Sequence, residues 1–177
     1  MKEKLKKVYY WTIELVGTMV SLISILLFSS YKVAYGVEKL KKERKREAFV
    51  LANGPSLKNV LLNKKRLAEI LRGDVIVMNN FANNELFWDL KPKYYILLDP
   101  LFYDERAVAM NVQFRMLYDS LHKVDWDMTL FLVKGANVTT VTKKIDNEKI
   151  KNVLFNGTKI VGYNRFQNFG YKYHLGV

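Results

Sequence analysis

The sequence predicts an α/β fold, in which a Rossmann-like parallel sheet of about five strands follows an N-terminal membrane helix. Three observations lead to this fold class. Short segments that are apolar along their whole length recur, helical segments separate them, and a long uncharged stretch stands near the N-terminus. Strands that are apolar on both sides are typical of a parallel sheet that helices cover on both faces. With 177 residues, 50% of them hydrophobic, the chain suffices for one packed domain and a short appendage.

The uncharged stretch runs from Leu15 to Tyr31 and has aromatic residues near both ends. A helix needs about 20 mostly apolar residues to cross a bilayer, with about 17 as the lower limit. The stretch therefore predicts a helix that spans the membrane once, or one that lies in the membrane interface. The interfacial alternative has a polar stripe at helical spacing, formed by Glu14, Thr18 and Ser21. A buried helix of a soluble protein is a third alternative, which the basic residues on both flanks disfavour.

Positive charge is concentrated around this stretch. The formal net charge is +12, and residues 1–47 carry half of it, with 11 Lys and Arg against 5 Glu. The pattern indicates an anionic membrane surface as partner and not nucleic acid, because the basic run adjoins an apolar helix and lacks interleaved aromatic residues. More Lys and Arg follow the stretch than precede it, so the positive-inside tendency places the main domain in the cytoplasm at the cell membrane.

The sequence divides into a membrane anchor helix with a basic flank at 1–36, a charged linker at 37–47 and the α/β domain at 48–177. The expected strands cover 48–53, 74–80, 93–100, 127–133 and 151–156. The expected helices cover 57–72, 103–121 and, weakly, 137–149, while 82–90 is a short helix or a loop. Ser56 is the expected cap of the first of these helices, and Gly73 ends it.

Polar residues interrupt the apolar pattern at three successive strand ends. Asn53-Gly54-Pro55-Ser56 follows the first strand, Asn79-Asn80 the second and Asp99-Pro100 the third. Right-handed crossovers bring the carboxyl ends of parallel strands to one edge of the sheet, which is where such sheets bind ligands. The sequence therefore predicts a ligand site at this edge.

Each of these residues suits a nucleotide. Gly54 lets the backbone approach a ligand closely, and Ser56 with the helix amides after it binds an anionic group. Asn79 and Asn80 offer donors and acceptors to a ribose or a base, and Asp99 can hold a ribose hydroxyl or a divalent metal such as Mg²⁺. Each also has a structural alternative, since Asn-Gly-Pro is a common turn and Ser a common helix cap.

The segments VLANGPSL, VIVMNNF and YYILLDP, in this order, resemble the hydroxymethylpterin-pyrophosphokinase-like (MptE-like) domain of bacterial surface-polysaccharide clusters. The same order is similar to the bacterial sialyltransferases of glycosyltransferase family 42. The resemblance covers about residues 48–103. It implies that Asn53 and Asn79 contact the CMP moiety, as the matching residues do in the sialyltransferases. The third motif is Asn-Pro in those enzymes and Asp99-Pro100 here, which brings the chain nearer to the pyrophosphokinase-like group.

The resemblance implies a membrane-anchored, glycosyltransferase-like protein of cell-surface polysaccharide synthesis. It would bind a nucleotide-sugar donor, CMP-linked or another, and transfer the sugar to a glycan or lipid-linked acceptor. Two alternatives stay open: an Mg-dependent pterin diphosphokinase-like enzyme with Asp99 as metal ligand, or a truncated, inactive, membrane-tethered binding domain. The family continues past the part matched here, so we expect a domain that is incomplete at its C-terminus.

No catalytic residue and no dedicated metal site is assigned from the sequence. His122 is expected at the surface of a helix, and His174 stands three residues from Val177, so neither is expected to be a general base. The Asp-Trp-Asp at 125–127 resembles the metal-binding motif of some glycosyltransferases, but it precedes a strand, so we interpret it as a solvated turn. The absence of cysteine excludes disulfides and thiolate metal sites.

Overall fold

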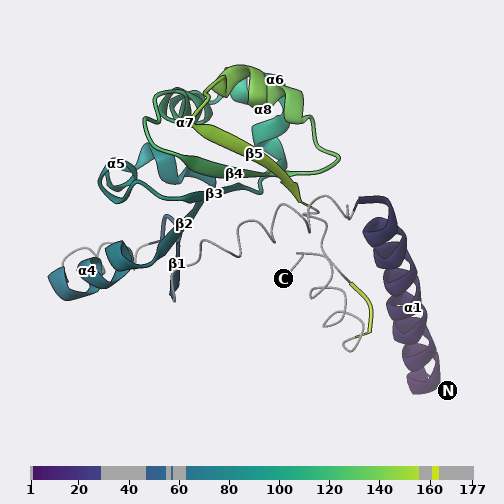
Figure 1. The fold of residues 1–177 in the computed structure, drawn as a ribbon. Coiled ribbons are helices and arrows are strands. Elements are labelled where there is room, and N and C mark those ends of the chain that lie inside the picture. Colours follow the sequence, from purple (N-terminus) through teal and green to yellow (C-terminus); the bar gives the residue numbers. More distant parts are fainter. Residues whose placement is uncertain (1, 29–46, 55–56, 58–62, 156–160, 164–177) are drawn as a thin grey trace. The chain divides into compact units, whose positions relative to one another are not determined.

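The computed structural model describes residues 2–28, 47–54, 57, 63–155 and 161–163 of the chain (Figure 1). The chain forms two compact units. One consists of Met1–Lys39 together with Phe155–Val177, and the other consists of Leu40–Leu154. The sequence-based division instead placed all of 48–177 in a single domain.

The second unit contains one five-stranded sheet, as the sequence predicted. Its strands are β1 (Ala48–Leu51), β2 (Asp74–Met78), β3 (Tyr94–Leu97), β4 (Met128–Val133) and β5 (Ile150–Phe155). All are parallel, and their order in the sheet is β1-β2-β3-β4-β5. The order follows the sequence and never reverses, so the sheet lacks the reversal point at which doubly wound folds bind nucleotides.

The apolar side chains of the strands are divided between the two faces of the sheet. Val77, Tyr95 and Leu130 lie in one row across the sheet and are fully buried. The neighbouring row on the other face contains Ile76 and Tyr94, which are only half-buried. Both faces are thus apolar, as the sequence showed, but one forms the core.

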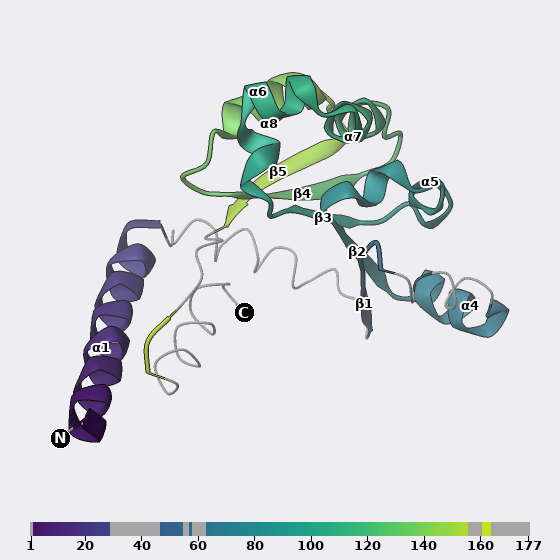
Figure 2. The ribbon, with the colours of Figure 1, turned by 180° about the vertical axis from the view of Figure 1, so that it is seen from behind.

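The described helices that follow β2 pack on the core face. In both views α6 (Glu105–Met110), α7 (Val112–His122) and α8 (Val138–Ile145) lie together on one side of β3–β5 (Figures 1 and 2). The short helix α5 (Leu86–Leu90) joins this layer through Phe87, whose ring centroid lies 5.8 Å from that of Tyr95. The expectation that helices cover both faces is therefore not met by these elements. A sequential strand order explains this, because every crossover then steps in the same direction.

Short polar residues end the helices earlier than expected. The predicted helix 103–121 is three elements, the 3₁₀ turn η2 (Pro100–Tyr103), α6 and α7. Asp104 and Asn111 cause the breaks, since each side chain accepts hydrogen bonds from the first amides of the next helix, at 2.8–2.9 Å. A second 3₁₀ turn, η1 (Asn79–Asn83), directly follows β2.

The predicted helix 57–72 contains α4 (Lys64–Arg72), and Leu57 is helical as well, while 58–62 lie outside the described residues. Asn63 caps α4 by accepting from the Arg66 amide at 3.1 Å. The predicted cap, Ser56, lies outside the described residues. Gly73 ends the helix, as predicted.

We expect Gly73→Ala to destabilise the domain by about 1–2 kcal/mol, because overpacking forces neighbouring groups to move. A Cβ at position 73 would lie 2.5 Å from the Phe49 ring and 3.0 Å from the carbonyl oxygen of Glu47. Urea denaturation measures the change. The control adds Gly73→Ala to a Phe49→Leu background, in which the clashing side chain is shorter. If Gly73→Ala costs as much in that background as in the natural chain, the clash is not the cause of the loss.

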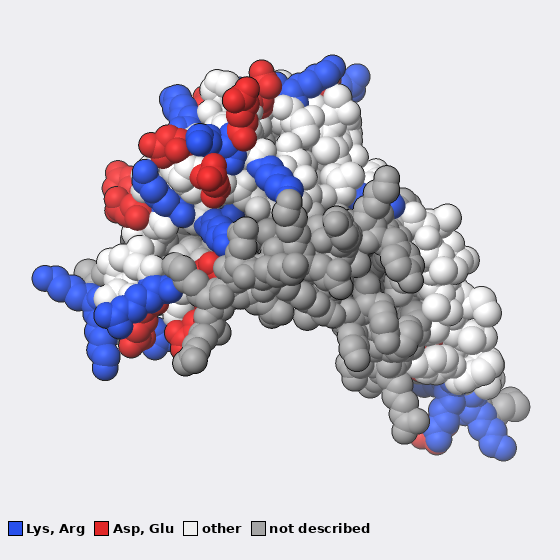
Figure 3. Space-filling view, in the orientation of Figure 1, with Lys and Arg blue, Asp and Glu red and all other residues white. Residues whose placement is uncertain are grey.

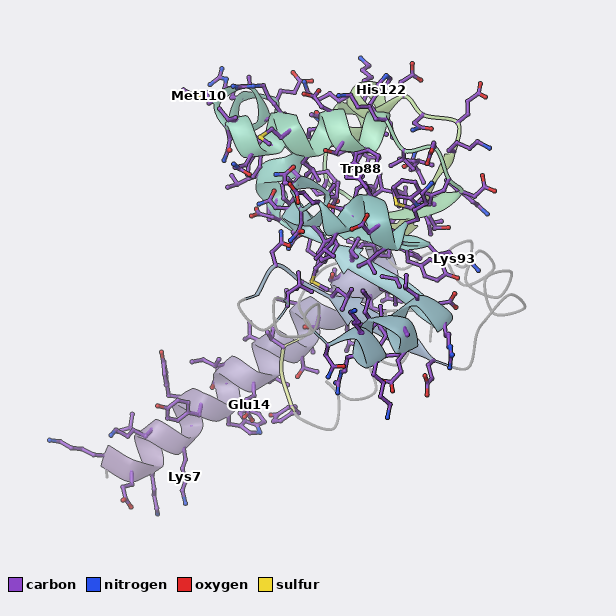
Figure 4. The ribbon with its side chains drawn as sticks, turned by 90° about the vertical axis from the view of Figure 1, so that its left-hand side faces the viewer. Lys7, Glu14, Trp88, Lys93, Met110 and His122 are labelled. Carbon is purple, nitrogen blue, oxygen red and sulfur yellow. The ribbon has the colours of Figure 1, made fainter. Side chains whose placement is uncertain are left out.

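The described part of the first unit consists of α1 (Lys2–Phe28), Phe155 and residues 161–163. Among the described residues, α1 is the one helix long and apolar enough to cross a membrane. Most of its large apolar side chains are exposed, and Lys7 and Glu14 both project from it (Figure 4). Length and composition thus support the predicted membrane helix.

Candidate functional site

The carboxyl edge of the sheet brings the predicted polar residues together. The register pairs Leu51 with Val77, so Asn53 and Asn79 each stand two residues beyond the same row. The Asn53 amide donates from Nδ2 to the carbonyl oxygen of Asn80 at 2.9 Å. The polar motifs that follow β1 and β2 therefore meet at neighbouring strand ends.

The third predicted group is joined to the second in the same way. Oδ1 of Asn79 accepts from the backbone amide of Leu98 at 3.0 Å, immediately before Asp99. Asn79 has a left-handed backbone with φ of 52°, a conformation that Asn tolerates better than most residues. Side-chain bonds thus link the ends of β1, β2 and β3 in a row.

Asp99 and Gly54 serve local turns. One carboxylate oxygen of Asp99 accepts from the Leu101 amide at 3.0 Å, and Pro100 begins η2. The Gly54 amide donates to the carbonyl oxygen of Ala52 at 2.8 Å, which forms a tight turn after β1. Pro55 and Ser56 lie outside the described residues.

Part of the hydrogen-bonding capacity at this edge remains unused by the described residues. Oδ1 of Asn53 and Nδ2 of Asn79 have no hydrogen-bond partner among them. Oδ1 of Asn80 is buried and also has no partner within the described part of the chain. The unused amide atoms of Asn53 and Asn79 can bond a bound molecule, whereas Oδ1 of Asn80 is closed to solvent.

Buried tyrosines, which the sequence analysis did not single out, fix the loops at this edge. The Tyr95 hydroxyl donates to the carbonyl oxygen of Asn79 and accepts from the Ala82 amide at 3.0 Å. The Tyr103 hydroxyl donates to the carbonyl oxygen of Leu97 at 2.8 Å and accepts from the amide of Val133 at 2.9 Å. These two hydroxyls hold the turn after β2 and the ends of β3 and β4.

Burial also changes the acidity of these side chains. Loss of solvation raises the pKa of Tyr95 and Tyr118 well above the ordinary range for a phenol, and it raises the pKa of Tyr103 to a lesser extent. The Tyr118 hydroxyl donates to the carbonyl oxygen of Phe102 at 2.5 Å. Only the regular alternation of β3 could have indicated that Tyr95 points inward.

A hollow of about 620 Å³ lies beside this row of strand ends, beyond β3 and β4. Its lining consists of Pro100, Tyr103, Asp104, Glu105, Arg106, Ala136 and Asn137. Pro100 is the one predicted site residue among them. The hollow is therefore displaced from the asparagines toward β4, and the sequence did not indicate it.

Some charged side chains of the hollow already bond to described residues, and one does not. Asp104 caps α6, and Glu105 accepts a long hydrogen bond of 3.5 Å from the Thr140 hydroxyl. Arg106 is exposed and forms no ion pair with any described residue. A cation at the carboxyl edge of a parallel sheet suits an anionic ligand group.

The described residues offer few side chains that could bind a metal ion. They contain no group of three or more His, Asp or Glu side chains that could hold an ion. Asp99 already uses one oxygen as a cap. Mg²⁺ bound by one carboxylate would depend on substrate phosphates for most of its ligands.

The Asp-Trp-Asp motif is a solvated turn, as interpreted from the sequence. Asp125 pairs with Lys91 at 3.2 Å and Asp127 with Lys149 at 3.6 Å, and all four side chains are more than half exposed. His122 lies at the surface at the end of α7, with Nδ1 2.6 Å from the carbonyl oxygen of Ile145 (Figure 4). His174 lies outside the described residues.

Comparisons with protein-family models, with curated proteins and with solved structures find no match to this chain.

Proposed function

We propose that this chain is a membrane-associated, glycosyltransferase-like protein that binds the nucleotide of a sugar donor along the carboxyl edge of its sheet. The observation that carries the proposal is the row of side-chain bonds from Asn53 to Asn80 and from Asn79 to Leu98. This row supports nucleotide binding because Asn79 keeps a free amide donor and Asn53 a free amide acceptor. Such a pair fits the hydrogen-bonding edge of a base or the hydroxyls of a ribose.

The neighbouring hollow adds room for the rest of the donor. A nucleotide base over the ends of β1–β3 would leave the hollow free for phosphate and sugar, and Arg106 in its lining would supply a positive charge to the phosphate. Synthesis of a cell-surface polysaccharide fits the motif resemblance and the apolar helix α1, because glycan and lipid-linked acceptors are found at membranes. Which donor, CMP-linked or another, is part of the test.

Diphosphate transfer from ATP to a pterin has weaker support. Such chemistry depends on Mg²⁺ held by several oxygen ligands, and Asp99 is the one predicted acidic ligand at this edge. The alternative of an inactive, tethered binding domain makes the opposite prediction to ours, namely no nucleotide binding.

The variant Asn79→Asp should weaken nucleotide binding about tenfold or more, the loss expected for one ligand hydrogen bond. It keeps Oδ1, which accepts from Leu98, but it removes the free Nδ2 donor and adds a negative charge. Calorimetric titration of the full chain in detergent with CMP, UDP and GDP provides the measurement.

The matched control is Asn111→Asp, which keeps the cap of α7 on the same unit and should leave the affinity unchanged. Two results contradict the proposal. One is the absence of binding to all three nucleotides at millimolar concentration, and the other is an equal effect of the two substitutions.

A further inference from the structure

The helix α1 carries a stripe of small and hydroxyl residues, hereafter the hydroxyl stripe, formed by Gly17, Thr18, Ser21 and Ser24. Residues three and four apart share a helix face, so these four lie side by side. Ser21 is 2% exposed and Ser24 is 8% exposed, although the helix as a whole is largely uncovered. The hydroxyl stripe is therefore a contact surface that is already covered.

The backbone of residues 161–163 covers the stripe at Gly17, Thr18 and Ser21. The Ser21 hydroxyl donates to the carbonyl oxygen of Val161 and accepts from the Val161 amide, both at 2.9 Å. The Tyr163 amide donates to the Thr18 hydroxyl at 3.1 Å, while that hydroxyl donates to the carbonyl oxygen of Glu14 at 2.7 Å. Three backbone groups of an extended segment are thus satisfied by two helix side chains.

Two glycines allow this close approach. A Cβ on Gly17 would lie 3.2 Å from Val161 Cγ2. A Cβ on Gly162 would lie 2.1 Å from the Thr18 hydroxyl oxygen, and the φ of +122° at Gly162 is one that side chains rarely adopt. Position 162 therefore needs a residue without a side chain, whereas a side chain at position 17 would require only that the Val161 methyl move by a few tenths of an ångström.

This contact bears on how α1 meets a membrane. Thr18 stands at the middle of the apolar part of the helix, Val8–Phe28. If α1 crossed a bilayer, the extended segment would lie near its centre, where irregular backbone is tolerated only when protein buries it. Val161 is 37% exposed and Tyr163 is half-buried, so the described residues do not bury the segment.

The opposite side of α1 suits lipid. Met19, Ile23 and Leu26 lie there by helical periodicity and are 55–79% exposed. The exposed lysines 2, 4, 6 and 7 stand at the N-terminal end, where basic side chains gather in the space-filling view (Figure 3). Basic residues beside an apolar helix face attract anionic phospholipid.

We propose that α1 lies in the plane of an anionic membrane surface, with its apolar side in the lipid. The hydroxyl stripe then faces away from the hydrocarbon, and residues 161–163 cover it. This placement rests on the membrane association in the proposed function and adds that both the N-terminal helix and the segment 161–163 stay at the same surface.

A pair of cysteines tests the contact, since the chain has none of its own. A Cβ at position 17 would lie 3.2 Å from Val161 Cγ2, so Gly17→Cys/Val161→Cys places the two new thiols beside each other, as a disulfide requires. Oxidation of the full chain in membranes of the expressing cells should protect both thiols from a maleimide-polyethylene glycol reagent. The control pair Met19→Cys/Val161→Cys, on the far side of α1, should stay modifiable. Equal protection of the two pairs, or none, overturns the contact.

Single cysteines test the placement. We compare Glu3→Cys and Lys32→Cys, one before and one after the apolar stretch, in spheroplasts and in inverted membrane vesicles with a membrane-impermeant maleimide. Both positions should react in the same preparation and be protected in the other. Labelling of one position in each preparation shows a spanning helix and overturns the interfacial placement.

Sedimentation separates failure of this inference from failure of the proposed function. A chain that stays in the membrane fraction but gives no selective disulfide contradicts the inference and leaves the proposed function intact. Loss of the chain from the membrane fraction contradicts the membrane association on which both rest. Vesicles of phosphatidylcholine with phosphatidylglycerol should bind the full chain at least about tenfold more tightly than vesicles of phosphatidylcholine alone, and equal binding contradicts the anionic surface.

Discussion

Replacing Tyr95 by Phe lowers the free energy of unfolding of the domain by about 1–3 kcal/mol, the cost of leaving buried polar groups without partners. The hydroxyl of Tyr95 is the partner of two backbone groups, the Asn79 carbonyl oxygen and the Ala82 amide. Ala82 is 2% exposed, so water does not readily replace the lost bond. Denaturant titration of the full chain in detergent measures the change.

The control for this substitution is Tyr94→Phe. Tyr94 is the preceding residue in β3, points to the opposite face, and makes no hydroxyl hydrogen bond with the described residues. Its loss should change the unfolding free energy by less than about 0.5 kcal/mol, as for other substitutions away from such features. If both variants lose the same stability, the Tyr95 hydroxyl does not hold the turn.

The effect of Tyr95→Phe should extend to ligand binding. The hydroxyl holds Asn79 through its backbone, and Asn79 presents its amide at the candidate site. A loosened turn would reduce nucleotide affinity even though Tyr95 need not touch the ligand. The extent of that loss measures how far rigid placement of the asparagines matters for binding.

Alkaline pH should destabilise the domain steeply. Burial raises the folded-state pKa of Tyr95 and Tyr118 above the ordinary value near 10 that these groups have when unfolded. Their contribution to stability is therefore fully present below about pH 10 and is lost as the pH rises above it, because only the unfolded chain then releases these protons. Two such groups give a slope of roughly 3 kcal/mol per pH unit.

Tyr118→Phe isolates one of the two titrating groups. The variant removes a bond to the carbonyl oxygen of Phe102, so its stability is lower at neutral pH. Its slope above about pH 10 should nevertheless fall by about 1.4 kcal/mol per pH unit, since one proton no longer takes part. Denaturation curves across that range, with ultraviolet difference spectra of tyrosinate, provide the measurement. A slope that is unchanged in the variant contradicts the assignment.

The sequence predicts the strands well because apolar runs bounded by Asn, Gly and Pro leave few other structures. It predicts the interruptions of the helices less well. Asp104 and Asn111 fit the polar side of one continuous amphipathic helix, but in the structure each caps the start of a new helix. Packing decides between the continuous helix and the capped break, so the local sequence does not. The neighbourhood of Asn53, Asn79 and Asp99 was predictable, since it follows from parallel strands alone.

Other features of the site could not be read from the sequence. The hollow beyond β3 and β4 depends on where η2 and α6 turn away from the sheet, which no local pattern encodes. The hydroxyl bridges of Tyr95 and Tyr103 join residues 6 to 30 positions apart. The pairing of Ser21 with Val161 spans 140 positions and involves a short segment without regular secondary structure.

The sequential strand order has a consequence for biosynthesis. Each strand pairs with the one made just before it, so no strand waits for a partner synthesised much later. Each strand of this sheet needs only the strand before it and the crossover between them, so the sheet can assemble stepwise as the chain leaves the ribosome. β1 and β2 can pair before β4 has been translated, and the growing edge is then extended one strand at a time. Vectorial folding of this kind shortens the period during which apolar strand edges are open to aggregation.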